Sequence, residues 1–72
     1  MITFEQVQAA AQAKGYSYSE DTLASEEVVL CSARSDECSM CIAFDVSEAE
    51  AGEQRCRARI LEGLDECPPV LS

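Results

Sequence analysis

The stretch that decides the fold is Cys38-Ser-Met-Cys-Ile-Ala-Phe-Asp-Val46, together with the preceding segment Glu27-Val-Val-Leu-Cys-Ser-Ala33. Both segments are rich in valine, isoleucine and phenylalanine, which favour strands. The residues between them, Arg34 to Glu37, fit a tight turn. The two segments are therefore predicted to form an antiparallel hairpin.

The simplest register of this hairpin pairs Arg34 with Glu37 and places Cys31 opposite Met40, although the turn lacks the glycine that the tightest hairpin turns prefer. Side chains alternate between the faces of a strand. One face is then formed by Val29, Cys31, Cys38, Met40, Ile42 and Phe44. The other face is also partly apolar, through Val28, Leu30, Cys41 and Ala43. Because a solvated sheet face is usually polar, this second face is a candidate contact surface for a partner or for a second copy of the chain.

Helical patterns flank the hairpin on both sides. Thr3 and Gln6 have the spacing of a capping box, in which each side chain satisfies the other residue's free backbone donor. Apolar residues then recur at helical spacing, so the first helix is expected over residues 4–14. Ser47 and Glu50 repeat the capping-box spacing, which predicts a second helix that begins there.

The second helix is predicted to end at Gly63 or Asp65, before a pair of prolines. Gly52 lies on its apolar face and indicates close packing against the sheet. Glu53 and Arg57 are i,i+4 neighbours and are expected to form an ion pair. All three arginines of this helix, Arg55, Arg57 and Arg59, are expected to pair with acids on a solvated face.

Residues 16–20 alternate in the manner of a short strand, and residues 21–26 are expected to form a loop. The order is then helix, strand, strand, strand, helix. This order predicts a single α+β domain over residues 1–72, with a small antiparallel sheet of about three strands and two helices packed on one face. A domain of this length is near the lower limit for burying a core, because ~60 residues bury only about 60% of their unfolded surface.

The negative charge is concentrated in the middle of the chain. The 72 residues include 14 acidic and 5 basic side chains, which gives a formal net charge of −9. Residues 17–54 hold ten of the acids and a single base, Arg34. Such a charge repels nucleic acid and anionic membranes and attracts basic surfaces. It also exceeds the magnitude of about 2–8 that is usual for a soluble small domain.

Most catalytic chemistry is disfavoured by what the composition lacks. There is no histidine, which removes the usual general base and the commonest metal ligand. The paired acids fall in predicted turns, where two carboxylates stay solvated and ionised. A chain this short leaves little room for a pocket of about 300–1,000 Å³ beside its core. There is no glycine-rich phosphate loop. We therefore expect no enzymatic activity.

The five cysteines suggest one alternative. Cys38 and Cys41 form a Cys-x-x-Cys motif and, with Cys31 and either Cys56 or Cys67, supply enough thiolates for a tetrahedral zinc site. Such sites usually contain two of these pairs, whereas this chain has one. On a regular strand the two thiols of the motif also point to opposite faces. We therefore expect packed, free thiols and no cofactor, with zinc as the alternative.

The compartment follows from two absences in the sequence. The amino-terminal residues show no basic segment followed by an apolar one, so no secretory signal is expected. No apolar run approaches the ~18–20 residues of a membrane span. The cytosol is the expected location, and thiols stay reduced there.

These features predict a non-enzymatic binding protein that inhibits a basic, nucleic-acid-binding protein by charge mimicry or by steric blocking. A folded acidic surface can compete for phosphate-binding grooves, since those grooves gain much of their affinity from neutralising charge. The partner-binding residues are expected to be Glu20, Asp21, Glu26, Glu27, Asp36, Glu37, Asp45 and Glu48. The alternative function is a small structural domain that coordinates zinc through Cys31, Cys38, Cys41 and Cys56.

In size, charge and helix–hairpin–helix organisation the chain resembles the small acidic inhibitors encoded by phages, including anti-CRISPR proteins, and toxin-neutralising immunity proteins. The resemblance lies in composition and organisation, and no motif carries it. It implies that the partner is a nucleic-acid-binding effector, such as a CRISPR complex or a nuclease, in the host cytoplasm.

Overall fold

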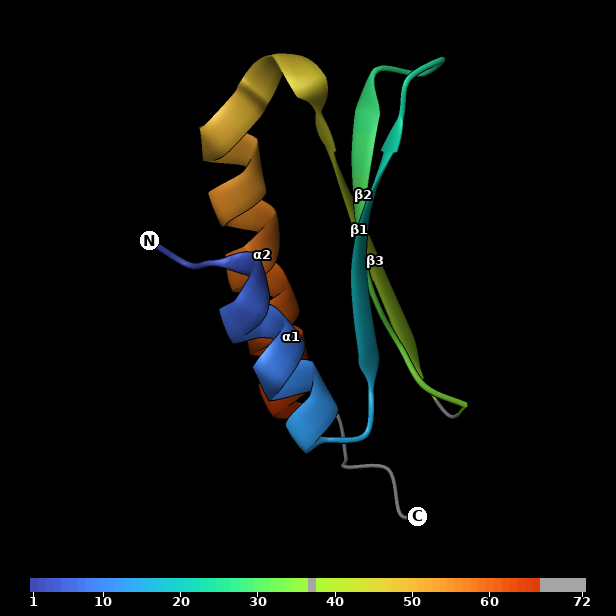
Figure 1. The fold of residues 1–72 in the computed structure, drawn as a ribbon, viewed down its shortest axis with the longest axis vertical. Helices are drawn as coiled ribbons and strands as arrows, with labels where there is room; N and C mark the ends of the chain where they lie inside the picture. Colours follow the sequence, from blue (N-terminus) through green and yellow to red (C-terminus); the bar gives the residue numbers. More distant parts are fainter. Residues whose placement is uncertain (37, 67–72) are drawn as a thin grey trace.

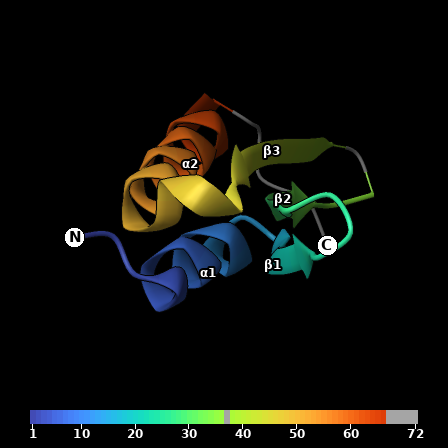
Figure 2. The same cartoon turned by 90° about the horizontal axis from the view of Figure 1, so that it is seen from above.

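The computed structural model describes residues 1–36 and 38–66 (Figure 1). The elements are α1 (Phe4–Ala13), β1 (Ser17–Leu23), β2 (Val28–Arg34), β3 (Ser39–Asp45), a 3-10 turn η1 (Val46–Glu48) and α2 (Ala49–Glu66). The strands form an open antiparallel sheet in the order β1-β2-β3. Both helices lie on the same side of this sheet (Figure 2). The predicted α+β fold is confirmed.

Helix α1 begins as the sequence predicts. The Thr3 backbone N–H donates to Gln6 Oε1 at 2.8 Å, and the Thr3 hydroxyl oxygen accepts from the Gln6 backbone N–H at 3.2 Å. The helix ends one residue before the predicted end and buries Val7 and Ala11 against the core. Neither α1 nor α2 combines the length and apolarity that a membrane-spanning helix needs.

Strand β1 is longer than predicted, and the loop expected over residues 21–26 is wrong in its first half. Asp21 pairs with Leu30, Thr22 with Val29, and the strand ends where its last residue meets Val28. Asp21 has a low strand propensity, but backbone pairing with the central, valine-rich strand β2 holds it in the sheet. The connecting loop is therefore only four residues long, 24–27.

The predicted register of the β2–β3 hairpin is wrong by two residues. Cys31 lies opposite Ile42, and the strands close at Arg34 and Ser39. Ser35 explains the wider turn, since its backbone N–H donates to the oxygen of residue 38 at 2.8 Å and its hydroxyl accepts that residue's N–H at 3.0 Å. A shift of two residues leaves every side chain on its original face. The predicted apolar face is therefore confirmed as the face beneath the helices.

Helix α2 does not begin with the predicted Ser47–Glu50 capping box. The cap lies two residues earlier, where the Asp45 backbone N–H donates to Glu48 Oε1 at 3.0 Å in the 3-10 turn. The helix also continues past its predicted end to Glu66. Gly63 does not end the helix but lies against β3, where a Cβ on the glycine would overlap the sulfur of a methionine.

Gly52 packs as closely as the sequence predicts. A Cβ at this position would lie 2.6 Å from Cδ2 of Phe44 and 2.9 Å from Cβ of Glu48, which is closer than side chains approach one another. The absence of a side chain therefore lets the first turns of α2 lie directly on the end of β3.

Three rows of side chains cross the helix-facing side of the sheet, as the pairings define them. They are Tyr18–Ala33–Met40, Glu20–Cys31–Ile42 and Thr22–Val29–Phe44. Helix α1 has 10 residues and spans about 15 Å, whereas the 7 residues of β1 span about 23 Å. Since α1 lies beside the lower half of the sheet in Figure 1, the third row faces α2 alone.

Candidate partner-binding surface

Five of the eight predicted partner-binding acids lie at one end of the sheet, and a sixth, Glu20, lies beside them in the middle row. Leu23, Val28 and Asp45 are opposite one another across the three strands. The Val46 backbone N–H donates to the Glu27 carbonyl at 2.9 Å, which holds the β1–β2 loop beside η1. Figure 1 shows this loop, η1 and the start of α2 at the same end of the molecule.

Glu50 and Glu53, from the first turns of α2, extend this group. We call it the acidic end. It consists of Glu20, Asp21, Glu26, Glu27, Asp45, Glu48, Glu50 and Glu53. Arg55 and Arg57 are the bases that pair with it. Eight acids against two bases leave −6 here, out of the formal −9 of the whole chain.

One described residue of the predicted set does not belong to the acidic end. Asp36 lies in the β2–β3 turn, at the opposite end of the sheet. Asp36 is close to the other acids in the sequence, but the turn of an antiparallel hairpin lies a full strand length away from the loop before it. Glu37 lies outside the described residues.

Glu20 differs from its neighbours because it forms an internal ion pair. Arg57 Nε donates to Glu20 Oε2 at 2.8 Å and Arg57 Nη2 donates to Glu20 Oε1 at 3.0 Å, a two-point contact. The Tyr18 hydroxyl also donates to Glu20. Burial raises the pKa of Glu20, but the hydrogen bonds from Arg57 and Tyr18 outweigh it and hold the pKa below its usual value. The carboxylate is thus committed to the fold.

Arg57 is buried, so the expectation that it lies on a solvated helix face is wrong. Its side chain is only 11% exposed. Besides Glu20, its Nη1 contacts Glu53 Oε1 at 2.8 Å, which confirms the predicted i,i+4 pair, and donates to the Ile2 carbonyl at 2.9 Å. The hydrogen bonds to Glu20 raise its pKa, so the guanidinium stays charged. Arg57 therefore joins α2, β1 and the amino terminus.

Glu48 and Arg55 form a second ion pair, at 2.6 Å, on the surface. The hydrogen bond from Arg55, followed by the one from the Asp45 backbone, lowers the pKa of Glu48. A surface pair of this kind contributes little stability, because solvent screens it. Glu48 can therefore exchange Arg55 for another cation at little cost.

The other acids of the acidic end project into solvent. They are Asp21, Glu26, Glu27, Asp45 and Glu50. Two residues at this end also have a positive φ, of 54° at Glu27 and 51° at Ala49. Non-glycine residues are uncommon in this region, and such strain gathers where a local shape is needed.

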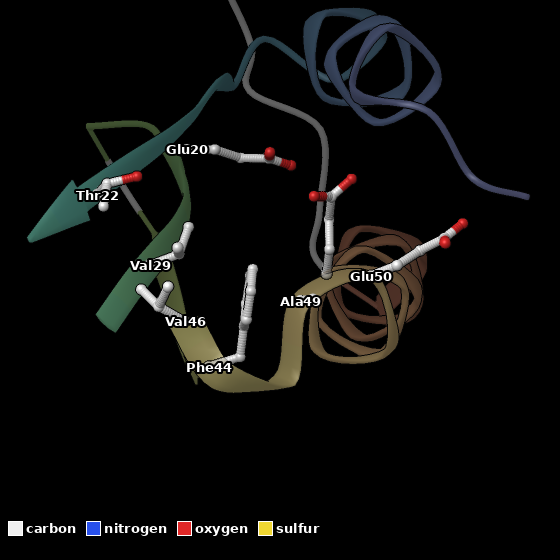
Figure 3. A pocket seen from close by; sticks show the side chains of 8 residues that line it. Glu20, Thr22, Val29, Phe44, Val46, Ala49 and Glu50 are labelled. Atoms are coloured by element: carbon white, nitrogen blue, oxygen red, sulfur yellow. The ribbon is translucent and has the colours of Figure 1, made fainter. Parts of the chain in front are cut away.

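A pocket opens between the third row of the sheet and the start of α2, and its volume is about 430 Å³. It is lined by Glu20, Thr22, Val29, Phe44, Val46, Ala49, Glu50 and Glu53. In Figure 3 the ring of Phe44 stands in the middle, with Val29 and Val46 to one side. The expectation that the chain leaves little room for a pocket of about 300–1,000 Å³ is therefore wrong. The pocket exists because α1 is too short to cover this end of the sheet.

Sequence reasoning missed the pocket residues Thr22, Val46 and Ala49, and assigned Glu50 and Glu53 to helix capping and ion pairing alone. The i,i+3 spacing of Glu50 and Glu53, which places both on one side of α2, is a signal that was present in the sequence. The valine and alanine carried no comparable signal, since single apolar surface residues are common.

The four described cysteines of the zinc alternative are not brought together. Cys31 and Cys56 are buried in the core, Cys38 is half-buried, and Cys41 is exposed on the opposite side of the sheet. Burial raises the pKa of the Cys31 thiol to about 11. Within residues 1–36 and 38–66, no three His, Cys, Asp or Glu side chains are arranged to hold a metal. Cys67 lies outside the described residues, and the absence of a cofactor stays a prediction.

No protein-family model, curated protein or solved structure shows significant similarity to this chain. Its own geometry and charge are therefore the guide to its function.

Proposed function

We propose that the protein is a non-enzymatic, cytosolic inhibitor that binds a basic, nucleic-acid-binding protein through its acidic end. The observation that carries this proposal is the convergence of eight acids, from two strands, a loop, the 3-10 turn and a helix, at or beside one end of the fold. Local sequence does not require such convergence. Like charges brought together destabilise a fold, so their retention favours a role in recognition.

The shape of the molecule supports the same function. Its extents are 38 × 25 × 17 Å, and the longest axis runs vertically in Figure 1. The acidic end is therefore a narrow end of an elongated body, which suits insertion into a groove that normally holds nucleic acid. Arginine and lysine side chains in such a groove would exchange phosphates for carboxylates. The remaining body would block access to the groove by its bulk.

The partner class follows from this chemistry. A nucleic-acid-binding effector such as a CRISPR complex or a nuclease presents the required basic groove, as the resemblance to small phage inhibitors and immunity proteins implies. The protein itself should bind neither nucleic acid nor anionic membranes, because both would be repelled. Self-association through the outer sheet face (Val28, Leu30, Cys41 and Ala43) is a separate prediction, which a mass measurement in solution tests.

The test is a pair of triple variants with equal charge change. One variant carries Asp21→Lys, Glu26→Lys and Asp45→Lys at the acidic end. The control carries the same reversal at the other end of α2, through Glu62→Lys, Asp65→Lys and Glu66→Lys. Each protein is used as bait in a lysate of its source cells, and captured proteins are then assayed for nucleic-acid binding with and without the inhibitor.

We expect the unaltered protein and the control to capture a basic protein and to displace its nucleic acid, and the acidic-end variant to do neither. Capture should also weaken between 0.15 M and 1 M salt, where the Debye length falls from about 8 to about 3 Å. Equal loss of capture in both variants would assign binding to net charge alone and would overturn the mapping. A captured partner whose nucleic-acid binding is unaffected would overturn the inhibitory function.

A further inference from the structure

We infer that the pocket at the acidic end is a specific site for the side chain of an arginine, presented by the basic partner. The inference rests on the proposed function and deepens it, since it names the group that the acidic end recognises. A specific site of this kind differs from the general attraction of a basic partner to a negatively charged surface.

One wall of the pocket is apolar. Val29 and Phe44 come from the sheet, Val46 comes from η1, and Ala49 is the first residue of α2. Val46 is 46% exposed, a high value for a large apolar side chain in so small a protein. The methylene groups of an arginine can cover such a surface while the charged head stays near water.

The opening of the pocket is surrounded by negative charge. Glu20, Glu50 and Glu53 all line the pocket. In Figure 3 Glu20 reaches across from the sheet, whereas the Glu50 side chain leaves α2 on the side away from the Phe44 ring. Arg57 neutralises only one of these three charges. The Glu53 side chain is 38% exposed even though it contacts Arg57, so it can accept further hydrogen bonds. Three acids against one base, Arg57, leave a net charge of −2 here, so the pocket combines an apolar wall with excess negative charge.

Other occupants fit this combination poorly. Anions are repelled by the three carboxylates. A neutral apolar ligand would strip water from those carboxylates without replacing their hydrogen bonds, which is costly. No three acidic side chains among the described residues are grouped to hold a metal ion.

Arginine fits better than lysine for a reason visible in the fold itself. Arg57 already shows that a guanidinium satisfies Glu20 at two points, through Nε and Nη2, and Glu53 at a third. A planar guanidinium offers five donors in a fixed arrangement and can also lie against an aromatic ring, whereas an ammonium is a compact and more strongly hydrated charge. Glu20 stays paired with Arg57, so the acceptors open to a partner's guanidinium are Glu50 and the exposed part of Glu53.

The test needs no identified partner. A blocked tripeptide with a central arginine is titrated into the isotope-labelled full chain, and backbone amide shifts are followed by NMR. The matched probe contains citrulline, which has nearly the same shape but no charge. We expect saturable shifts at Val29, Val46 and Ala49, and affinity about tenfold or more lower for citrulline, because a charge-assisted hydrogen bond is replaced by a neutral one.

Two variants test whether the arginine peptide binds in the pocket. Val46→Ser removes part of the apolar wall without changing charge, and Glu50→Gln removes one charge. Each should weaken arginine-peptide binding by about fivefold, while Glu62→Gln, which removes one charge elsewhere on α2, should change it by less than about twofold. The amide spectra of the variants report whether the fold is intact.

Equal binding of the citrulline peptide, or shifts spread over the exposed acids without the pocket residues, would overturn the inference. So would equal effects of Glu50→Gln and Glu62→Gln. These outcomes are distinct from failure of the proposed function. Capture that depends on the acidic end but is unaffected by Val46→Ser would retain the function and remove the pocket. Peptide binding in the pocket without capture of any nucleic-acid-binding partner would retain the pocket and remove the proposed function.

Discussion

Replacing Glu20 with glutamine should destabilise the protein by about 2–4 kcal/mol. The side chain keeps its size, but one of the two oxygens that accept from Arg57, at 2.8 and 3.0 Å, becomes an amide that faces a donor. Hydrogen bonds to charged groups contribute about 1.5–3 kcal/mol, and leaving a buried charge with fewer partners adds to the loss. At about 0.05–0.15 kcal/mol per residue, this is a large part of the total stability of a small domain.

The contribution of Glu20 to the free energy of unfolding should depend on pH. Since the pKa of Glu20 is held below its usual 4.5, the stabilisation by its charge is complete above that pH and is lost as pH falls through the lowered pKa. A protonated glutamate resembles glutamine in shape and charge. The difference between the two proteins should therefore be full at pH 7 and should shrink in acid.

Urea unfolding followed by circular dichroism, at neutral and acidic pH, measures both quantities. Glu26→Gln is the matched control, because Glu26 is an exposed loop residue and should change stability by no more than about 0.5 kcal/mol. A change in Glu20→Gln no larger than in this control would refute the structural role of the ion pair. A difference that persists unchanged at acidic pH would refute its dependence on the charge of Glu20.

Three further outcomes are expected. Alkylation, followed by peptide mass spectrometry, should label the exposed Cys41 quickly. Cys31 is buried, and burial raises the pKa of its thiol to about 11, so it should be labelled only at the rate of unfolding. Equal labelling rates for the two thiols would contradict the buried placement of Cys31. Gly52→Ala should lower thermal stability despite the gain of about 1 kcal/mol in helix propensity, because the new Cβ would lie 2.6 Å from the Phe44 ring and 2.9 Å from Cβ of Glu48. Gly63→Ala meets only the end of a flexible methionine and should be tolerated. Added salt should raise the melting temperature of the free protein, because it screens repulsion at the acidic end; a melting temperature that falls steadily with sodium chloride would show that this repulsion is unimportant.

The parts of this fold that the sequence predicts are those that depend on neighbours in the chain. Thr3 and Gln6 cap α1 as their spacing requires. The alternation of β2 and β3 assigns each side chain to a face, and this assignment survives the error in register because the error is an even number of residues. Gly52 could be placed against the sheet because a glycine weakens a helix, so its presence on the apolar face indicates that a side chain there would not fit.

The parts that the sequence does not predict depend on contacts between distant residues. Ser35 sets the hairpin register through its hydroxyl, and nothing in the turn distinguishes this arrangement from a tighter one beforehand. The Glu20–Arg57 pair spans 37 positions and joins a strand to a helix. Nothing in the local sequence around either residue indicates that the two side chains are in contact. The same limit hid the pocket, which is defined by where α1 stops.

The Glu20–Arg57 pair separates the acids of this protein into two groups with different roles. Glu20 and Glu53 surround a buried guanidinium, and so hold the start of α2 against β1 and the amino terminus. This contact joins the helix to the middle row of the sheet, beside the pocket. The exposed acids beyond it add charge without adding internal contacts. A protein that needed acids only for solubility would gain from spreading them over its surface, because repulsion falls with distance. The proposed binding of a basic partner would account for their concentration at one end of the fold.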